Sequence, residues 1–77
     1  MKAEQLETRV RERLSQVTQV RAMDLTGGGD HWRMTIVAGD FRGLSLVEQH
    51  QLVYRAVDEW MKDGQIHALS LETKVNP

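Results

Sequence analysis

The chain has 77 residues, of which 40% are hydrophobic and 27% charged, and its formal net charge is −1. This length supports one small domain and not two, so we expect a single domain over residues 1–77. The near-neutral charge lacks the strongly basic footprint of a dedicated nucleic-acid-binding protein. With no cysteine, the chain has no disulfide framework and no thiolate metal site of its own.

The sequence shows neither a membrane span nor a secretion signal. No apolar run approaches the roughly 18 residues that a transmembrane helix needs. The segment that follows Met1 lacks the apolar core of a signal peptide. Since the absence of cysteine is also compatible with a reducing compartment, we expect a cytoplasmic protein without a membrane partner.

The first expected element is an amphipathic helix over residues 3–17. Its apolar stripe follows the helical period of about 3.6 residues and consists of Leu6, Val10, Leu14 and Val17. The charged residues on the other faces are most simply a solvated surface, with a partner-binding role as the alternative. A strand is expected next, over residues 18–26, because β-branched and alternating residues dominate that segment.

Three consecutive glycines at 27–29 predict a hairpin loop, because glycine tolerates positive φ. A glycine-rich loop can also cradle a phosphate, but that role needs a helix directly after it. A strand is expected here instead, over residues 31–39. Its core-facing residues alternate with solvent-facing ones and are Trp32, Met34, Ile36 and Ala38. His31 then lies on the open sheet face, where a plain exposed histidine is the simplest interpretation.

Residues 39–44 predict a connector in which Phe41 anchors the turn in the core. Ser45 and Glu48 have the spacing of a capping box, in which both side chains bind free backbone N–H groups. A helix is therefore expected over residues 46–62. It should end at Asp63-Gly64, with glycine in the left-handed position.

The apolar stripe of this second helix is expected to comprise Leu46, Val47, Val53, Tyr54, Val57, Trp60 and Met61. His50 falls inside this stripe or at its edge, which indicates a packed or hydrogen-bonded histidine, with a direct functional role as the alternative. Arg55 belongs to the wet face, together with Asp58, Glu59 and Lys62.

A third strand is expected over residues 66–75, with Asn76 and Pro77 ending it. The order helix, strand, strand, helix, strand predicts an α+β fold: a three-stranded mixed sheet with both helices on one face. His67 follows a glycine break and comes where this strand begins. A metal-competent side chain at the mouth of a core strand is the best functional lead in the sequence, although it could also be an ordinary strand-end histidine.

Four ordered segments resemble the BolA-like family. They are HWRMTIV at 31–37, FRGLS at 41–45 for the F-x-G-x-S turn, QHQLVY at 49–54 for R-H-R-x-V-Y, and IHALSL at 66–71 for the H-A-L strand. The resemblance implies an α-β-β-α-β fold similar to the type II KH fold. It also implies that the chain pairs with a monothiol glutaredoxin as a heterodimer.

In such pairs a 2Fe–2S cluster bridges the two proteins, and the resemblance assigns the H-A-L histidine, His67, as a ligand. The glutaredoxin supplies a cysteine and a bound glutathione thiol. The family's second ligand is a histidine or cysteine in the loop between the first two strands. The loop is short here and has neither, so the nearest candidate is His31. No cluster is expected in the isolated chain, which cannot close the site alone.

The resulting hypothesis is an accessory protein of iron–sulfur trafficking or of iron and redox regulation. Histidine ligation raises the reduction potential of a 2Fe–2S centre relative to thiolates and makes it sensitive to protonation. These properties suit sensing or transfer. The free protein could form a homodimer, and the sequence does not identify the particular glutaredoxin.

The alternative function is a transcriptional regulator that binds nucleic acid through the KH-like fold. Arg33, Arg42 and Arg55, with His50, are the candidate contacts with nucleic acid or a partner. The charge balance predicts weak binding at most, and glutamines at 49 and 51 replace the basic residues that many family members have. An enzyme is not expected, because no nucleophile with a base and an orienting group is visible.

Overall fold

The computed structural model describes residues 1–76. Its elements are α1 (Ala3–Arg13), β1 (Val17–Asp24), β2 (His31–Ala38), the 3-10 turn η1 (Gly39–Phe41), α2 (Leu46–Ala56), α3 (Asp58–Lys62) and β3 (Ala68–Lys74). The strands form one sheet in the order β1-β2-β3. β1 runs antiparallel to β2, and β3 runs parallel to it. The predicted mixed sheet is confirmed, while the expected stop at Pro77 lies outside the described residues.

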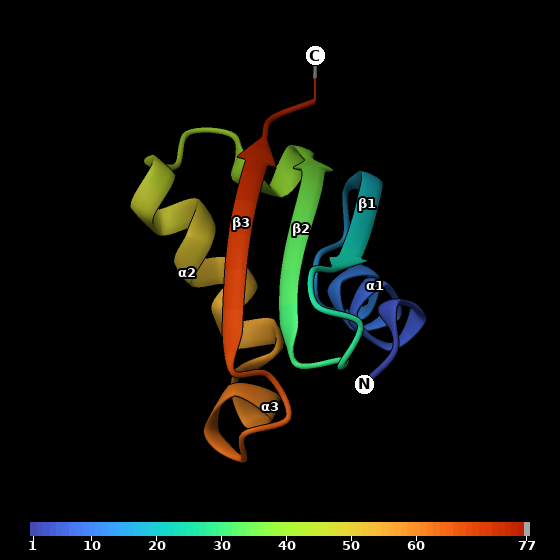
Figure 1. Ribbon diagram of the computed structural model, residues 1–77. Coiled ribbons are helices and arrows are strands. Elements are labelled where there is room, and N and C mark those ends of the chain that lie inside the picture. Colours follow the sequence, from blue (N-terminus) through green and yellow to red (C-terminus); the bar gives the residue numbers. More distant parts are fainter. Residues whose placement is uncertain (77) are drawn as a thin grey trace.

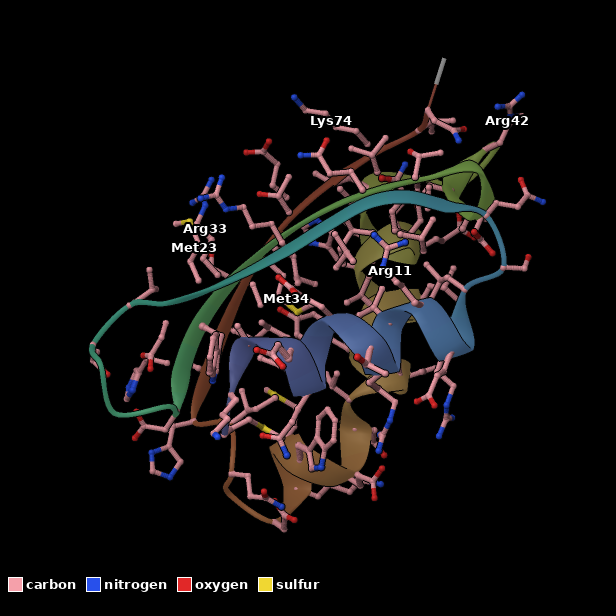
Figure 2. The ribbon with its side chains drawn as sticks, turned by 90° about the vertical axis from the view of Figure 1, so that its right-hand side faces the viewer. Arg11, Met23, Arg33, Met34, Arg42 and Lys74 are labelled. Atoms are coloured by element: carbon pink, nitrogen blue, oxygen red, sulfur yellow. The ribbon has the colours of Figure 1, made fainter. Side chains whose placement is uncertain are left out.

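The helices cover one face of the sheet and leave the other face open (Figure 1). The predicted alternation of β2 is confirmed, because Trp32, Met34, Ile36 and Ala38 are at most 2% exposed. Figure 2 shows Met34 between the sheet and α1, with Met23 and Arg33 on the opposite side. Phe41 is fully buried, as expected, and joins this core together with residues of α1 and α2.

The first helix is shorter than predicted and ends at Arg13 instead of residue 17. Leu14 is already extended, with φ −115° and ψ 127°, and its N–H donates to the carbonyl of Val10. Its side chain is nevertheless 2% exposed. The apolar period therefore continues past the end of the helix, because an extended residue reaches the same core. Val17, predicted as the last residue of the stripe, opens β1.

The second helix begins with the predicted capping box, in which Ser45 Oγ accepts the N–H of Glu48 and Glu48 accepts that of Ser45. The expected single helix is nevertheless wrong, because Val57 leaves the helical region with φ −115° and ψ 15° and separates α2 from α3. Val57 is fully buried, so the break occurs where the chain turns its side chain into the core.

The predicted apolar stripe of this helix is wrong at its start. Leu46 and Val47 are 60% and 66% exposed, and Tyr54 is 36% exposed. Figure 1 shows the start of α2 projecting past the β3 side of the sheet, so its first turn has no strand beneath it. Helical spacing alone does not reveal where the sheet ends.

The third strand begins at Ala68, two residues later than predicted, because pairing with β2 starts at the pair His31 and Ala68. Gly64 has a φ of 83°, which confirms the left-handed end of the helical segment. Ile66 is buried, and its N–H donates to the carbonyl of Trp60. Within residues 1–76, no helix is long and apolar enough to cross a membrane.

Candidate metal centre

Two of the three histidines lie close together at the end of the sheet where β2 and β3 begin. Since these strands are parallel, their first residues lie side by side, and His31 pairs with Ala68. His67 directly precedes Ala68 and donates its backbone N–H to the carbonyl of Asp30 over 2.8 Å. The register of the sheet therefore brings His31 and His67 to one place.

The carboxylate of Asp30 lies between the two imidazoles. Asp30 Oδ1 is 2.9 Å from His31 Nδ1, and Asp30 Oδ2 is 3.2 Å from His67 Nδ1. The ring centroids are 5.9 Å apart, and the planes cross at 89°. The two imidazole side chains are 43% and 59% exposed, so a second molecule can reach them.

The pKa of Asp30 is lowered from its ordinary value, first by the hydrogen bond with His31 and further by the charges of both histidines. Asp30 is therefore an ionised acceptor at neutral pH. A carboxylate beside the Nδ1 atom of a histidine is the usual partner of an imidazole that binds metal through its other nitrogen. In both side chains the carboxylate therefore lies on the Nδ1 side of the ring.

The loop before Asp30 is fixed by side chains of neighbouring strands. Asp24 Oδ1 accepts the N–H of Gly27, and Asp24 Oδ2 accepts that of Gly29, each over 2.9 Å. Trp32, at 2% exposure, donates its indole N–H to the carbonyl of Gly29 over 3.0 Å. These hydrogen bonds order the glycine loop and so give Asp30 a defined position.

The described residues do not supply a complete metal site. Within the part of the chain that the structure describes, no group of three or more histidine, cysteine, aspartate or glutamate side chains could hold a metal ion. A metal at His31 and His67 would therefore need further ligands from outside the described residues. Because the site faces solvent, a second molecule can approach it.

His50 lies apart from this pair, on α2. It is partly buried, which agrees with the predicted packing role. Its Nε2 atom is buried and has no hydrogen-bond partner among the described residues, so of the two interpretations, packed or hydrogen-bonded, packing is the one that this atom supports.

The three candidate arginines do not form one patch. Arg33 pairs with Glu72 over 3.1 Å on the open sheet face, and Arg42 donates to the carbonyl of Asn76 over 3.3 Å. Figure 2 shows Arg33 and Arg42 toward opposite ends of the sheet. Arg55 is exposed on α2, within the helical layer. This separation does not favour a concentrated basic surface.

Sequence reasoning missed the shared role of Asp30 and the loop contacts of Asp24 and Trp32. Asp30 is adjacent to His31, so a local pair was visible in the sequence. Its contact with His67 depends on the parallel pairing of β2 with β3, for which no short-range signal exists. The one available clue was that His31 and His67 each stand at a predicted strand start.

The family model described as BolA-like protein matches residues 3–76. The protein RP812 of Rickettsia prowazekii is 37% identical over 54 residues, which cover 70% of this chain and 69% of that protein. The structure of BolA1 from Arabidopsis thaliana is similar at a TM-score of 0.84 and 27% identity, over 97% of this chain and 95% of that one. The BolA domain of SufE1 from the same plant also gives 0.84, at 26% identity, over 95% and 90%.

Proposed function

The chain belongs to the BolA-like protein family, and from that premise we propose that it acts with a monothiol glutaredoxin in iron–sulfur trafficking or iron regulation. BolA-like proteins are generally non-enzymatic regulators or accessory proteins. In the proposed heterodimer the two proteins share a 2Fe–2S cluster. His31 and His67 supply ligands from this chain, and the glutaredoxin cysteine and glutathione supply thiolates.

The observation that carries this proposal is the convergence of His31 and His67 on Asp30. The ring centroids lie 5.9 Å apart, so both imidazoles belong to one site. Both imidazole side chains are partly exposed, so a partner could reach them. The carboxylate of Asp30 holds the Nδ1 side of the rings, as expected for histidines that ligate through Nε2.

The ligand count explains why a partner is needed. The chain has no cysteine, and residues 1–76 contain no group of three or more histidine, cysteine, aspartate or glutamate side chains that could hold a metal ion. Two imidazoles cannot close a cluster site, whereas thiolates from a glutaredoxin and glutathione complete it. Imidazole ligation of one iron raises the reduction potential of the cluster relative to thiolate ligation.

The comparisons give indirect support to this proposal. One of the similar structures is a BolA domain that forms part of SufE1, which hints at an iron–sulfur-related role. The nucleic-acid alternative lacks comparable support, because Glu72 is close to both Arg33 and Lys74 on the open sheet face. A glutaredoxin-linked role is therefore the function that the site supports best.

Anaerobic reconstitution with a purified monothiol glutaredoxin, glutathione, iron and sulfide tests the proposal. Visible absorption and circular dichroism are recorded while this protein is added to the glutaredoxin. We expect the spectrum of the glutaredoxin alone to be replaced by that of a mixed complex that elutes as a heterodimer. An unchanged glutaredoxin spectrum at excess of this protein would refute it.

A further inference from the structure

The carboxylate of Asp30 uses one oxygen for each histidine. Oδ1 lies 2.9 Å from His31 Nδ1, and Oδ2 lies 3.2 Å from His67 Nδ1. An ionised carboxylate is only an acceptor. A neutral imidazole that faces it therefore has its proton on Nδ1, because a lone pair there would repel the oxygen. The same condition applies to both rings.

We propose that Asp30 is a positioning residue that sets the tautomer of His31 and His67 together, so that both present an unprotonated Nε2. The functional value of this tautomer rests on the proposed function, because a metal bound by these rings needs the lone pair of the unprotonated Nε2. The tautomers themselves are a property of the free chain and can be measured without a metal or a partner.

The backbone holds Asp30 in this place independently of its carboxylate. The Asp30 carbonyl accepts the N–H groups of His67 and Ala68 over 2.8 and 3.3 Å. These bonds link the loop to the start of β3. The hydroxyl of Thr26 is the other side-chain neighbour, 3.5 Å from Asp30 Oδ1. A change confined to the carboxylate therefore leaves these backbone links in place.

The substitution Asp30→Asn makes the two histidines face chemically different groups. The amide keeps one acceptor oxygen and replaces the other with an NH₂ donor. The imidazole that faces the NH₂ group must accept at Nδ1, so its own proton moves to Nε2. That ring then offers no lone pair at Nε2. The substitution is nearly isosteric and removes one ligand atom without removing a histidine.

Long-range nitrogen-15 to proton NMR of the free chain tests the proposal. It is recorded at about pH 8.5, well above the ordinary imidazole pKa of about 6.5. In the wild type we expect both histidines to show protonated Nδ1 and unprotonated Nε2. In Asp30→Asn at least one of them should shift to the form protonated at Nε2. His50 provides an internal reference in both spectra.

Asp24→Asn is the matched control, because Asp24 orders the same loop through Gly27 and Gly29. Within the part of the chain that the structure describes, Asp24 makes no hydrogen bond to either imidazole. We expect this variant to keep both Nδ1–H tautomers. A wild type whose two rings are protonated at Nε2, or an Asp30→Asn spectrum identical to wild type, would overturn the proposal. The same tautomer change in Asp24→Asn would overturn it too, since loop order would then be the cause.

The NMR experiment and the reconstitution experiment can refute their two proposals independently. If reconstitution with glutaredoxin gives no mixed cluster while the wild-type rings carry Nδ1–H, the role of Asp30 in setting the tautomers is supported, and the glutaredoxin partner is refuted. If a mixed cluster forms but the free chain shows Nε2–H, the role of Asp30 falls and the proposed function stands.

Discussion

The imidazole rings of His31 and His67 lie 5.9 Å apart between centroids and cross at 89°, although α2 and α3 separate the two residues in the sequence. Parallel pairing of β2 with β3 produces this meeting. The carboxylate of Asp30, on the loop before β2, contacts the Nδ1 atom of each ring. The site is thus a product of sheet register, and its stability depends on the loop and strands that maintain that register.

The indole of Trp32 should be one of the main supports of the loop. Trp32→Phe removes the hydrogen bond to the Gly29 carbonyl and leaves a small void in the core. We expect the free energy of unfolding to fall by about 1–2 kcal/mol, measured by urea denaturation. A variant as stable as wild type would show that the indole does not hold the loop.

The glycines of the loop should differ in their tolerance of a side chain. Gly27 and Gly29 both have positive φ, 82° and 75°, but a Cβ at Gly29 would lie 2.7 Å from the backbone oxygen of Met1, whereas one at Gly27 meets nothing within 4 Å. Gly27→Ala should cost about 1 kcal/mol from backbone strain alone. Gly29→Ala should cost more in the same thermal or urea melt, and equal losses would contradict the packing of Met1 on the loop.

The capping box of α2 predicts a measurable loss of stability in Ser45→Ala. That change removes the acceptor for the Glu48 N–H and should cost about 1 kcal/mol at neutral pH. Urea midpoints of the variant and the wild type provide the measurement. A loss within experimental error would show that solvent replaces the cap at this exposed helix start.

The same box predicts a pH dependence. Hydrogen bonding to the Ser45 backbone N–H and side chain lowers the pKa of Glu48 from its ordinary value of 4.5. A lowered folded-state pKa stabilises the fold above the unfolded-state pKa, and this contribution is lost as the pH falls through the folded value. Glu48→Gln keeps an acceptor without the charge. Between pH 7 and about pH 3, wild type should therefore lose more stability than Glu48→Gln; parallel curves would contradict this assignment.

His50 should be dispensable for both stability and the metal centre. Its buried Nε2 atom has no hydrogen-bond partner among the described residues, and replacing an unsatisfied polar group with an apolar one of similar size is nearly neutral or stabilising. The free energy of unfolding of His50→Leu, measured in urea, should lie within about 1 kcal/mol of the wild-type value. A much larger loss would indicate that the imidazole is bonded in solution.

The periodicity of the sequence predicted the strands better than the helices. In β2, alternate residues from Trp32 to Ala38 are buried because the strand has one covered face and one open face. In the second helical segment, the apolar stripe predicted neither the break at Val57 nor the exposure of Leu46. Both depend on where the sheet lies, which is a tertiary property.

The candidate site could be predicted only in part for the same reason. His67 stood out through its place before a strand, and the resemblance to a family connected it with His31. Asp30 could be paired with His31 from adjacency. Its contact with His67 requires the parallel register that pairs His31 with Ala68, which no local pattern of residues encodes.

In the proposed complex, His31 and His67 are the ligands that this chain contributes to a cluster shared with a glutaredoxin. The most direct measurement is anaerobic reconstitution of that complex with His31→Ala, His67→Ala and, as the matched control, His50→Leu, followed by visible circular dichroism. We predict that His67→Ala and His31→Ala each lose or alter the mixed-complex spectrum and that His50→Leu reproduces the wild type. Wild-type spectra from both His31→Ala and His67→Ala would show that neither imidazole is a cluster ligand.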